Sequence, residues 1–142
     1  MLALLAAAAI AAQCPPPSAR QVRNSLVNWL EAYRGRDLGG TMAIFNPAVR
    51  RQFQGVPDQG WDDLRKAYQK QFEATASSEW RPLWEQVMVS GPLAIAFATW
   101  SEHFADNPKP RAVYRAVDVL RRGKDCRWQI VRSVNYPLKD GK

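Results

Sequence analysis

Hydrophobic residues recur every three or four positions in the first half of this chain, whereas in the second half they alternate with polar residues. The first spacing is typical of amphipathic helices, and the second is typical of strands with one face on a core. Helices followed by an antiparallel meander predict an α+β domain in which the helices pack on one face of a sheet.

The first predicted helix has the clearest boundaries. Ser18 and Gln21 form the pattern of a capping box, in which each side chain satisfies a free backbone group of the other residue. Gly35 ends the helix. Its apolar face consists of Val22, Leu26, Trp29, Leu30 and Tyr33.

Two further helices are expected before the sheet. A short one is capped by Asp37, carries Ile44 and Phe45, and ends at Asn46-Pro47. Residues 48–60 are ambiguous, because 49–54 could form a short strand before a turn or loop. The third helix has its apolar face on Trp61, Leu64, Tyr68 and Phe72.

Four strands are expected after the helices, over residues 80–89, 93–104, 112–120 and 127–136. The last two form a hairpin around Gly123-Lys124-Asp125. Asp118 interrupts the apolar pattern of this hairpin. It shares one side of its strand with Ala112, Tyr114, Ala116 and Leu120, so it is expected either to be paired or to face a pocket.

The start of the chain differs from the rest. Residues 1–12 are uncharged and rich in Leu and Ala, which predicts a signal peptide cleaved before Ala12 or Gln13. This stretch is too short to span a bilayer. Residues 13–18 form a Pro-rich linker, and 19–138 form the single domain. The expected location is periplasmic or secreted.

Cys14 and Cys126 are the two cysteines, and three interpretations of them stay open. In an exported chain they could form a disulfide. They could also be two unpaired thiols, or Cys14 could carry a lipid, although Ala11-Ala12-Gln13 matches a lipobox poorly. Only lipidation would anchor the protein to a membrane.

The net charge of +7 favours anionic partners, but the basic residues are scattered and form no run. Nucleic acid is therefore not an expected partner. One histidine and two distant cysteines make no metal cluster, and the chain has neither a Gly-rich phosphate loop nor a nucleophile elbow. We expect no metal and no cofactor.

Three short segments, in this order, resemble the NTF2-like superfamily. They are Gly35-Arg36-Asp37-Leu38, Val89-Ser90-Gly91-Pro92-Leu93-Ala94, and the final hairpin from Asp118 to Tyr136. The last segment is similar to the SnoaL-like or DUF4440-type branch, which is related to ketosteroid isomerase. The resemblance covers about residues 19–138. It implies a cone, in which a bent sheet wraps around three helices and encloses an apolar pocket.

The resemblance does not carry the isomerase mechanism with it. The position of the oxyanion-hole tyrosine falls on Trp29, and that of the general base falls near Phe53, where no carboxylate is available. Only the oxyanion-hole aspartate is matched, by Asp118. The predicted pocket residues are Trp29, Tyr33, Phe53, Tyr114, Asp118 and Arg132.

Asp118 is the first candidate for chemistry, as an acid whose pKa is raised by an apolar wall. The alternative is a salt bridge to Arg132, which the hairpin register could place on the same face. Tyr114 is a candidate hydrogen-bond partner of Asp118. His103 shares a strand face with Phe97, Thr99 and Ser101 and is a weaker catalytic candidate.

These observations predict an exported domain that binds a small apolar or amphipathic molecule. One alternative is a lyase or isomerase that uses Asp118 as its acid. Another is an interaction module, for which the expected partner is a second copy of the chain, forming a homodimer across the sheet.

Overall fold

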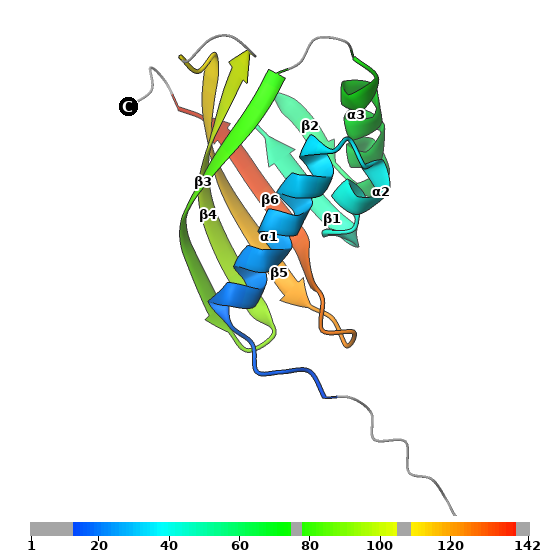
Figure 1. The fold of residues 1–142 in the computed structure, drawn as a ribbon, viewed down its shortest axis with the longest axis vertical. Coiled ribbons are helices and arrows are strands. Elements are labelled where there is room, and N and C mark those ends of the chain that lie inside the picture. The colour runs from blue at the N-terminus through cyan, green and yellow to red at the C-terminus, as the bar shows by residue number, and fades with distance from the viewer. Residues whose placement is uncertain (1–12, 75–77, 105–108, 139–142) are drawn as a thin grey trace, which may run out of the picture.

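The computed structural model describes residues 13–74, 78–104 and 109–138. Its elements form the expected α+β arrangement (Figure 1). None of the described helices combines the length and the apolar character that crossing a bilayer requires. In chain order the elements are α1 (Ala19–Arg34), α2 (Leu38–Met42), β1 (Phe45–Phe53), β2 (Val56–Gln59), α3 (Trp61–Glu73), β3 (Ser78–Ser90), β4 (Leu93–Phe104), β5 (Ala112–Arg122) and β6 (Trp128–Pro137).

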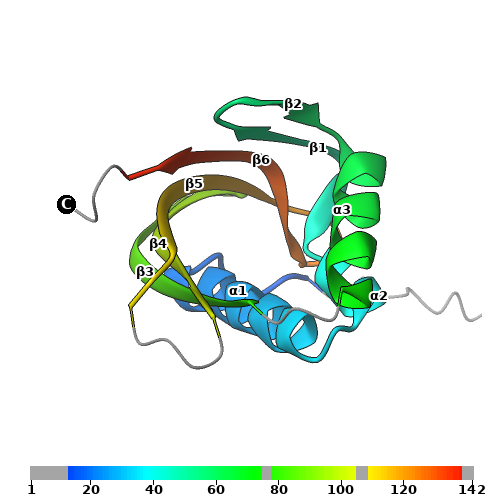
Figure 2. The same cartoon turned by 90° about the horizontal axis from the view of Figure 1, so that it is seen from above.

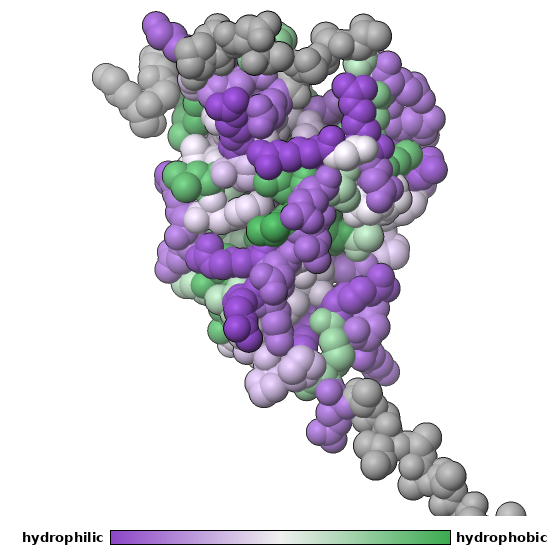
Figure 3. All heavy atoms as spheres, in the orientation of Figure 1, coloured by the Kyte–Doolittle hydropathy of each residue, from purple (hydrophilic) through white to green (hydrophobic). Residues whose placement is uncertain are grey.

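Helix α1 begins where the capping box predicts. The backbone nitrogen of Gln21 donates to Ser18 Oγ over 3.3 Å, and the backbone nitrogen of Ser18 donates to Gln21 Oε1 over 3.3 Å. Val22 and Leu26, on the inward face, are buried in the core. The outward side of the helix is largely hydrophilic (Figure 3), so α1 is amphipathic as its spacing predicts.

The second helix is shorter than predicted. Helix α2 ends at Met42, and Ile44 and Phe45 lead into β1 instead of continuing the helix. The backbone nitrogen of Ile130 donates to the Ile44 carbonyl over 2.7 Å, which joins this segment to β6. The ambiguous segment that follows forms the β1–β2 hairpin. Long-range strand pairing therefore prevails over the local helical spacing.

The six strands form one mixed, mostly antiparallel sheet in the order β2-β1-β6-β5-β4-β3. The exception is β1, which runs parallel to β6, the last strand of the chain. Seen from above, the sheet bends around its concave side, where α1 and α3 lie (Figure 2). No described helix covers the convex side. The predicted cone, with helices packed in a curved sheet, is confirmed.

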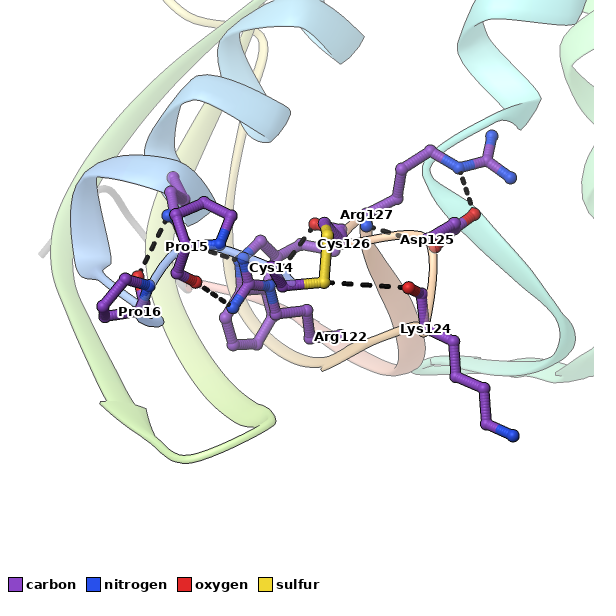
Figure 4. The surroundings of a disulfide bond; sticks show 10 residues. Cys14, Pro15, Pro16, Arg122, Lys124, Asp125, Cys126 and Arg127 are labelled. Atoms are coloured by element: carbon purple, nitrogen blue, oxygen red, sulfur yellow. Dashed lines mark hydrogen bonds and ion pairs between the residues drawn. A yellow bond between two sulfur atoms is a disulfide. The ribbon is translucent and has the colours of Figure 1, made fainter. Parts of the chain in front are cut away.

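The segment before α1 is fastened to the turn between β5 and β6. Cys14 and Cys126 form a disulfide in the structure (Figure 4). Beside it, Arg122 Nη1 donates to the Pro15 carbonyl over 2.6 Å. The predicted signal peptide, residues 1–12, lies outside the described residues.

Candidate functional site

The concave side of the sheet, α1 and α3 enclose a cavity of about 490 Å³. Aromatic and aliphatic side chains form most of its wall: Leu26, Trp29, Tyr33, Phe45, Phe53, Ala67, Tyr68, Ala74, Trp80, Trp100, Tyr114 and Ile130. Six polar residues interrupt it, namely Arg51, Gln71, Glu102, Asp118, Ser133 and Asn135. An apolar wall with a few polar groups is the usual composition of a small-molecule site.

Three neighbouring strands place Arg51, Ser133 and Asp118 in one row across this wall. Arg51 of β1 is in register with Ser133 of β6, and Ser133 is in register with Asp118 of β5. Because neighbouring strands lie about 4.8 Å apart, two strand spacings separate the backbones at Arg51 and Asp118. Ser133, on the middle strand, therefore lies between Arg51 and Asp118 in this row.

Asp118 combines burial with access to the cavity. Its exposed fraction is only 7%, yet it belongs to the cavity wall. Loss of hydration raises the pKa of Asp118 to about 6, although hydrogen bonding from Ser133 and the charge of Arg51 act to lower it. Near pH 6 the carboxyl group therefore exists in both forms, and the neutral form can donate a hydrogen bond to a ligand.

Arg51 is held by neutral acceptors. Its Nε and Nη2 donate to Gln59 Oε1 over 3.0 and 2.8 Å, and its Nη1 donates to the phenolic oxygen of Tyr68 over 3.4 Å. Tyr68 comes from α3 and is buried, which raises its pKa, while the nearby charge of Arg51 acts to lower it. These contacts fix the guanidinium at the cavity wall.

A second polar pair lies where α1 faces α3. Gln71 Nε2 donates to the hydroxyl of Tyr33 over 2.6 Å, and burial raises the pKa of Tyr33 well above its ordinary value. Trp29 stacks on Tyr33 with 5.4 Å between ring centroids and meets Trp100 edge to face at 5.3 Å. The buried indole nitrogen of Trp29 has no hydrogen-bond acceptor among the described residues.

The structure brings most of the predicted pocket residues together. Those on the cavity wall are Trp29, Tyr33, Phe53, Tyr114 and Asp118. Tyr114 packs its ring against Phe53 and Trp80, with centroid distances of 4.9 and 5.5 Å. No hydrogen bond joins Tyr114 to Asp118 in the structure, so its contribution to the wall is aromatic surface.

Arg132 does not lie on the cavity wall, contrary to the sequence-based prediction. It is exposed and is in register with Val119, whereas Ser133 is the neighbour of Asp118. The reason is a bulge: Leu120 pairs with Ile130 and Val119 pairs with Arg132, so one extra residue is inserted in β6. Such an insertion exchanges the two faces of a strand, and the salt bridge to Asp118 is not formed.

His103 also lies on the other face of the sheet from the one considered for it. The residues of β4 that reach the cavity are Trp100 and Glu102, and alternation therefore turns His103 to the convex side. Its Nε2 lies 2.9 Å from the hydroxyl of Ser101, a neighbour on that same face. His103 is thus separated from Asp118 by the sheet.

The wall residues that the sequence does not single out include Arg51 and Tyr68. Arg51 shares a strand face with Val49 and Phe53, which indicates an inward side chain once residues 45–53 are recognised as a strand. Tyr68 was placed on the apolar face of its helix, but only the fold shows its hydroxyl meeting Arg51. The sequence thus indicates the face on which each side chain lies. That the two side chains meet in the cavity follows only from the pairing of β1 with β6.

The arrangement offers binding and proton exchange. Aromatic rings can cover an apolar body, Arg51 and the hydroxyl groups can bind polar atoms, and Asp118 can give or take a proton. Among the described residues, no three His, Cys, Asp or Glu side chains come close enough to hold a metal ion.

Comparisons with solved structures find the same fold. An NTF2-like protein of unknown function from Pseudomonas putida KT2440 superposes with a TM-score of 0.72 at 18% identity, covering 90% of this chain and 93% of that one. A ketosteroid isomerase-like protein from Erwinia carotovora atroseptica SCRI1043 gives 0.66 at 18% identity, with coverages of 84% and 95%. An NTF2-like protein of unknown function from Shewanella oneidensis MR-1 gives 0.69 at 20% identity, with coverages of 82% and 97%.

No curated protein matches the sequence of this chain. The model of the SnoaL-like domain family, by contrast, matches residues 26–131, which include the second half of α1, the whole β1–β2 hairpin, Arg51 and Asp118. Sequence and fold thus agree with the resemblance that the three motifs indicated. The chain belongs to the SnoaL-like domain family, and its fold is the one seen in NTF2-like proteins.

Proposed function

We propose that this domain binds a small, mainly apolar or amphipathic molecule in the cavity between the sheet and α1 and α3. The observation that supports this proposal is the aromatic wall, across which Arg51, Ser133 and Asp118 form one row of polar groups. An apolar ligand gains free energy by leaving water, and the polar row gives it one orientation.

Native mass spectrometry of the protein purified from its own host tests this proposal. We expect a mass adduct that denaturation removes and that Asp118→Asn reduces. Asp58→Asn is the matched control, because Asp58 is exposed in β2 and lies outside the cavity wall. An unliganded protein, together with no change in ligand response on Asp118→Asn, would contradict the proposal.

A second candidate is a lyase or isomerase that uses Asp118 as its acid. It is favoured by one observation, the pKa of Asp118 near 6, which permits proton transfer close to neutral pH. If the co-purified molecule is converted by the protein, Asp118→Asn should abolish the conversion, including that of the molecules it still binds. Conversion that persists at the wild-type rate in this variant would exclude Asp118 as the acid.

We also propose that the protein is exported, to the periplasm or the medium. Two features support export: the uncharged residues 1–12 and the Cys14–Cys126 disulfide, a bond that persists in oxidising compartments. The disulfide uses the sulfur that a lipid would modify, which favours a form without a membrane anchor. Sequencing the N-terminus of the natural protein is the test, and a start at Met1 would contradict cleavage.

A homodimer across the convex side of the sheet completes the proposal. Strand alternation places a row of apolar side chains on this face, where no described helix covers them. They are Leu83, Met88, Ile95, Phe97, Val117, Val119 and Val134. Thr99, Glu85 and Arg115 separate Leu83 from the other six, which are cross-strand neighbours and form the apolar patch proposed as the interface.

A further inference from the structure

Arg51 is a cation on the cavity wall, and no carboxylate in the described part of the chain forms an ion pair with it. The described residues form ion pairs between Glu79 and both Arg34 and Arg81, between Glu85 and Arg115, and between Asp125 and Arg127. All of these pairs involve partly or largely exposed side chains, and none includes Arg51. The guanidinium that faces the cavity thus differs from the paired arginines at the surface.

The hydrogen bonds of Arg51 orient the guanidinium but supply no anionic partner. Gln59 and Tyr68 accept its hydrogen bonds through uncharged oxygen atoms, at 2.8 to 3.4 Å. A guanidinium has five N–H donors, and the hydrogen bonds to Gln59 and Tyr68 use three of them. Removing a cation from water without an anionic partner is unfavourable, so a group held in this way favours an anion.

Asp118 does not fill this role. It is in the same row, but β6 lies between its strand and that of Arg51, and no ion pair joins the two. Glu102, the other carboxylate of the wall, comes from β4, which is one strand further from Arg51. The space beside Arg51 is instead bordered by the rings of Phe53 and Tyr68.

We propose that the ligand of this cavity is an organic acid, whose single carboxylate or sulfonate group binds to Arg51 while its apolar body packs against the aromatic wall. Planar guanidinium groups bind such anions with two parallel hydrogen bonds. The inference rests on the proposed binding function and specifies the chemical class of the ligand. The net charge of +7 acts in the same direction, because it attracts anions to the protein.

Two fluorescent probes with the same apolar body test the inference. N-phenyl-1-naphthylamine is neutral, and 8-anilinonaphthalene-1-sulfonate adds one sulfonate to the same skeleton. Fluorescence titration of the full-length protein should give 1:1 binding of both, with the sulfonate bound more tightly. A charge-assisted hydrogen bond contributes about 1.5–3 kcal/mol, which corresponds to a tighter Kd by between about tenfold and a hundredfold.

Arg51→Gln should remove this preference and leave the Kd of the neutral probe within about twofold. Arg50→Gln is the matched control, because it removes the same charge from the adjacent, exposed position of β1 and should retain the preference. Arg51→Lys keeps the charge and should retain part of the preference. Titration with the neutral probe reports in each variant whether the cavity is intact.

The outcomes separate the two proposals. Equal affinities of the wild type for both probes, or an equal loss of sulfonate binding in Arg50→Gln and Arg51→Gln, would overturn the inference about Arg51 and leave a neutral ligand in the cavity. If neither probe binds to the wild type, the proposed binding function fails as well.

Discussion

Asp118 makes the stability of this protein depend on pH in a direction opposite to that of most carboxyl groups. Its pKa rises from the ordinary 3.8 to about 6 in the folded state. Between these values the folded state holds a proton that the unfolded state has lost, so the free energy of unfolding falls as pH increases. Each pKa unit corresponds to about 1.4 kcal/mol, and the full contribution is therefore roughly 3 kcal/mol.

We expect Asp118→Asn to remove this contribution. Urea unfolding of both proteins between pH 4 and 8 should show the stability of the variant rising relative to the wild type, by up to roughly 3 kcal/mol, before reaching a plateau above pH 6. Glu79 and Asp125 have pKa values lowered by arginine partners and act in the opposite direction, so the difference between the two proteins is the quantity to compare. A difference that does not change with pH would contradict the raised pKa.

The sequence alone was sufficient to single out Asp118, because alternation along one strand is a local property. It was not sufficient for the partners of Asp118. The bulge in β6 places Ser133 instead of Arg132 beside Asp118, and no residue type near the bulge predicts it from the sequence. For β4 the sequence correctly places His103 and Ser101 on one face. The buried face is the other one, which carries the small Ala94 and Ala96, so side-chain size does not indicate which face of β4 is turned inward.

At the scale of elements, the sequence predicts ends that depend on neighbouring residues, but it does not predict pairings between distant strands. The capping box at Ser18 fixed the start of α1, and Gly91, with a φ of 53°, occupies the tight turn expected between β3 and β4. The end of α2 depends on β6, about 85 residues later, because the Ile44 carbonyl accepts a hydrogen bond from the backbone nitrogen of Ile130. The parallel pairing of β1 with β6 placed Arg51 in the site, and nothing within β1 itself specifies that partner.

The disulfide connects two elements that are far apart in sequence, the segment before α1 and the β5–β6 turn. Its cysteines are separated by 112 positions. A bond that closes so long a loop restricts the unfolded chain strongly, by up to roughly 5 kcal/mol in the loop-entropy model. The hydrogen bond from Arg122 to the Pro15 carbonyl holds the same segment in place in addition to the disulfide.

Replacing both cysteines, by Cys14→Ser with Cys126→Ser, should therefore lower the free energy of unfolding by about 2–5 kcal/mol without dissolving the fold. Urea unfolding with and without dithiothreitol is the measurement. The reduced wild type should match the variant, and the variant should not respond to the reductant. Equal stability of the oxidised wild type and the variant would show that the bond contributes nothing.

The whole molecule has two faces of different character. Helices α1 and α3 lie on the concave side of the sheet, and no described helix lies over the convex side (Figure 2). The cavity is on the concave side, and strand alternation places apolar side chains on the convex side. Leu83 is 64% exposed and Met88 is 45% exposed on that side. Burying such surface against an identical face is favourable at about 25 cal/mol for each Å².

The proposed homodimer makes a prediction at this scale. In analytical ultracentrifugation the wild type should sediment as a dimer, and Val117→Lys should convert it to a monomer, because the substitution places a charge amid the apolar row of β4, β5 and β6. Asn28→Lys is the control, since it adds the same charge at an exposed position of α1, on the concave side of the sheet. A wild-type monomer, or a dimer that Val117→Lys leaves intact, would show that this face is not the interface.

Because the cavity opens on the other side of the sheet, probe binding should survive in the Val117→Lys monomer, and its loss there would mean that association and ligand binding are coupled.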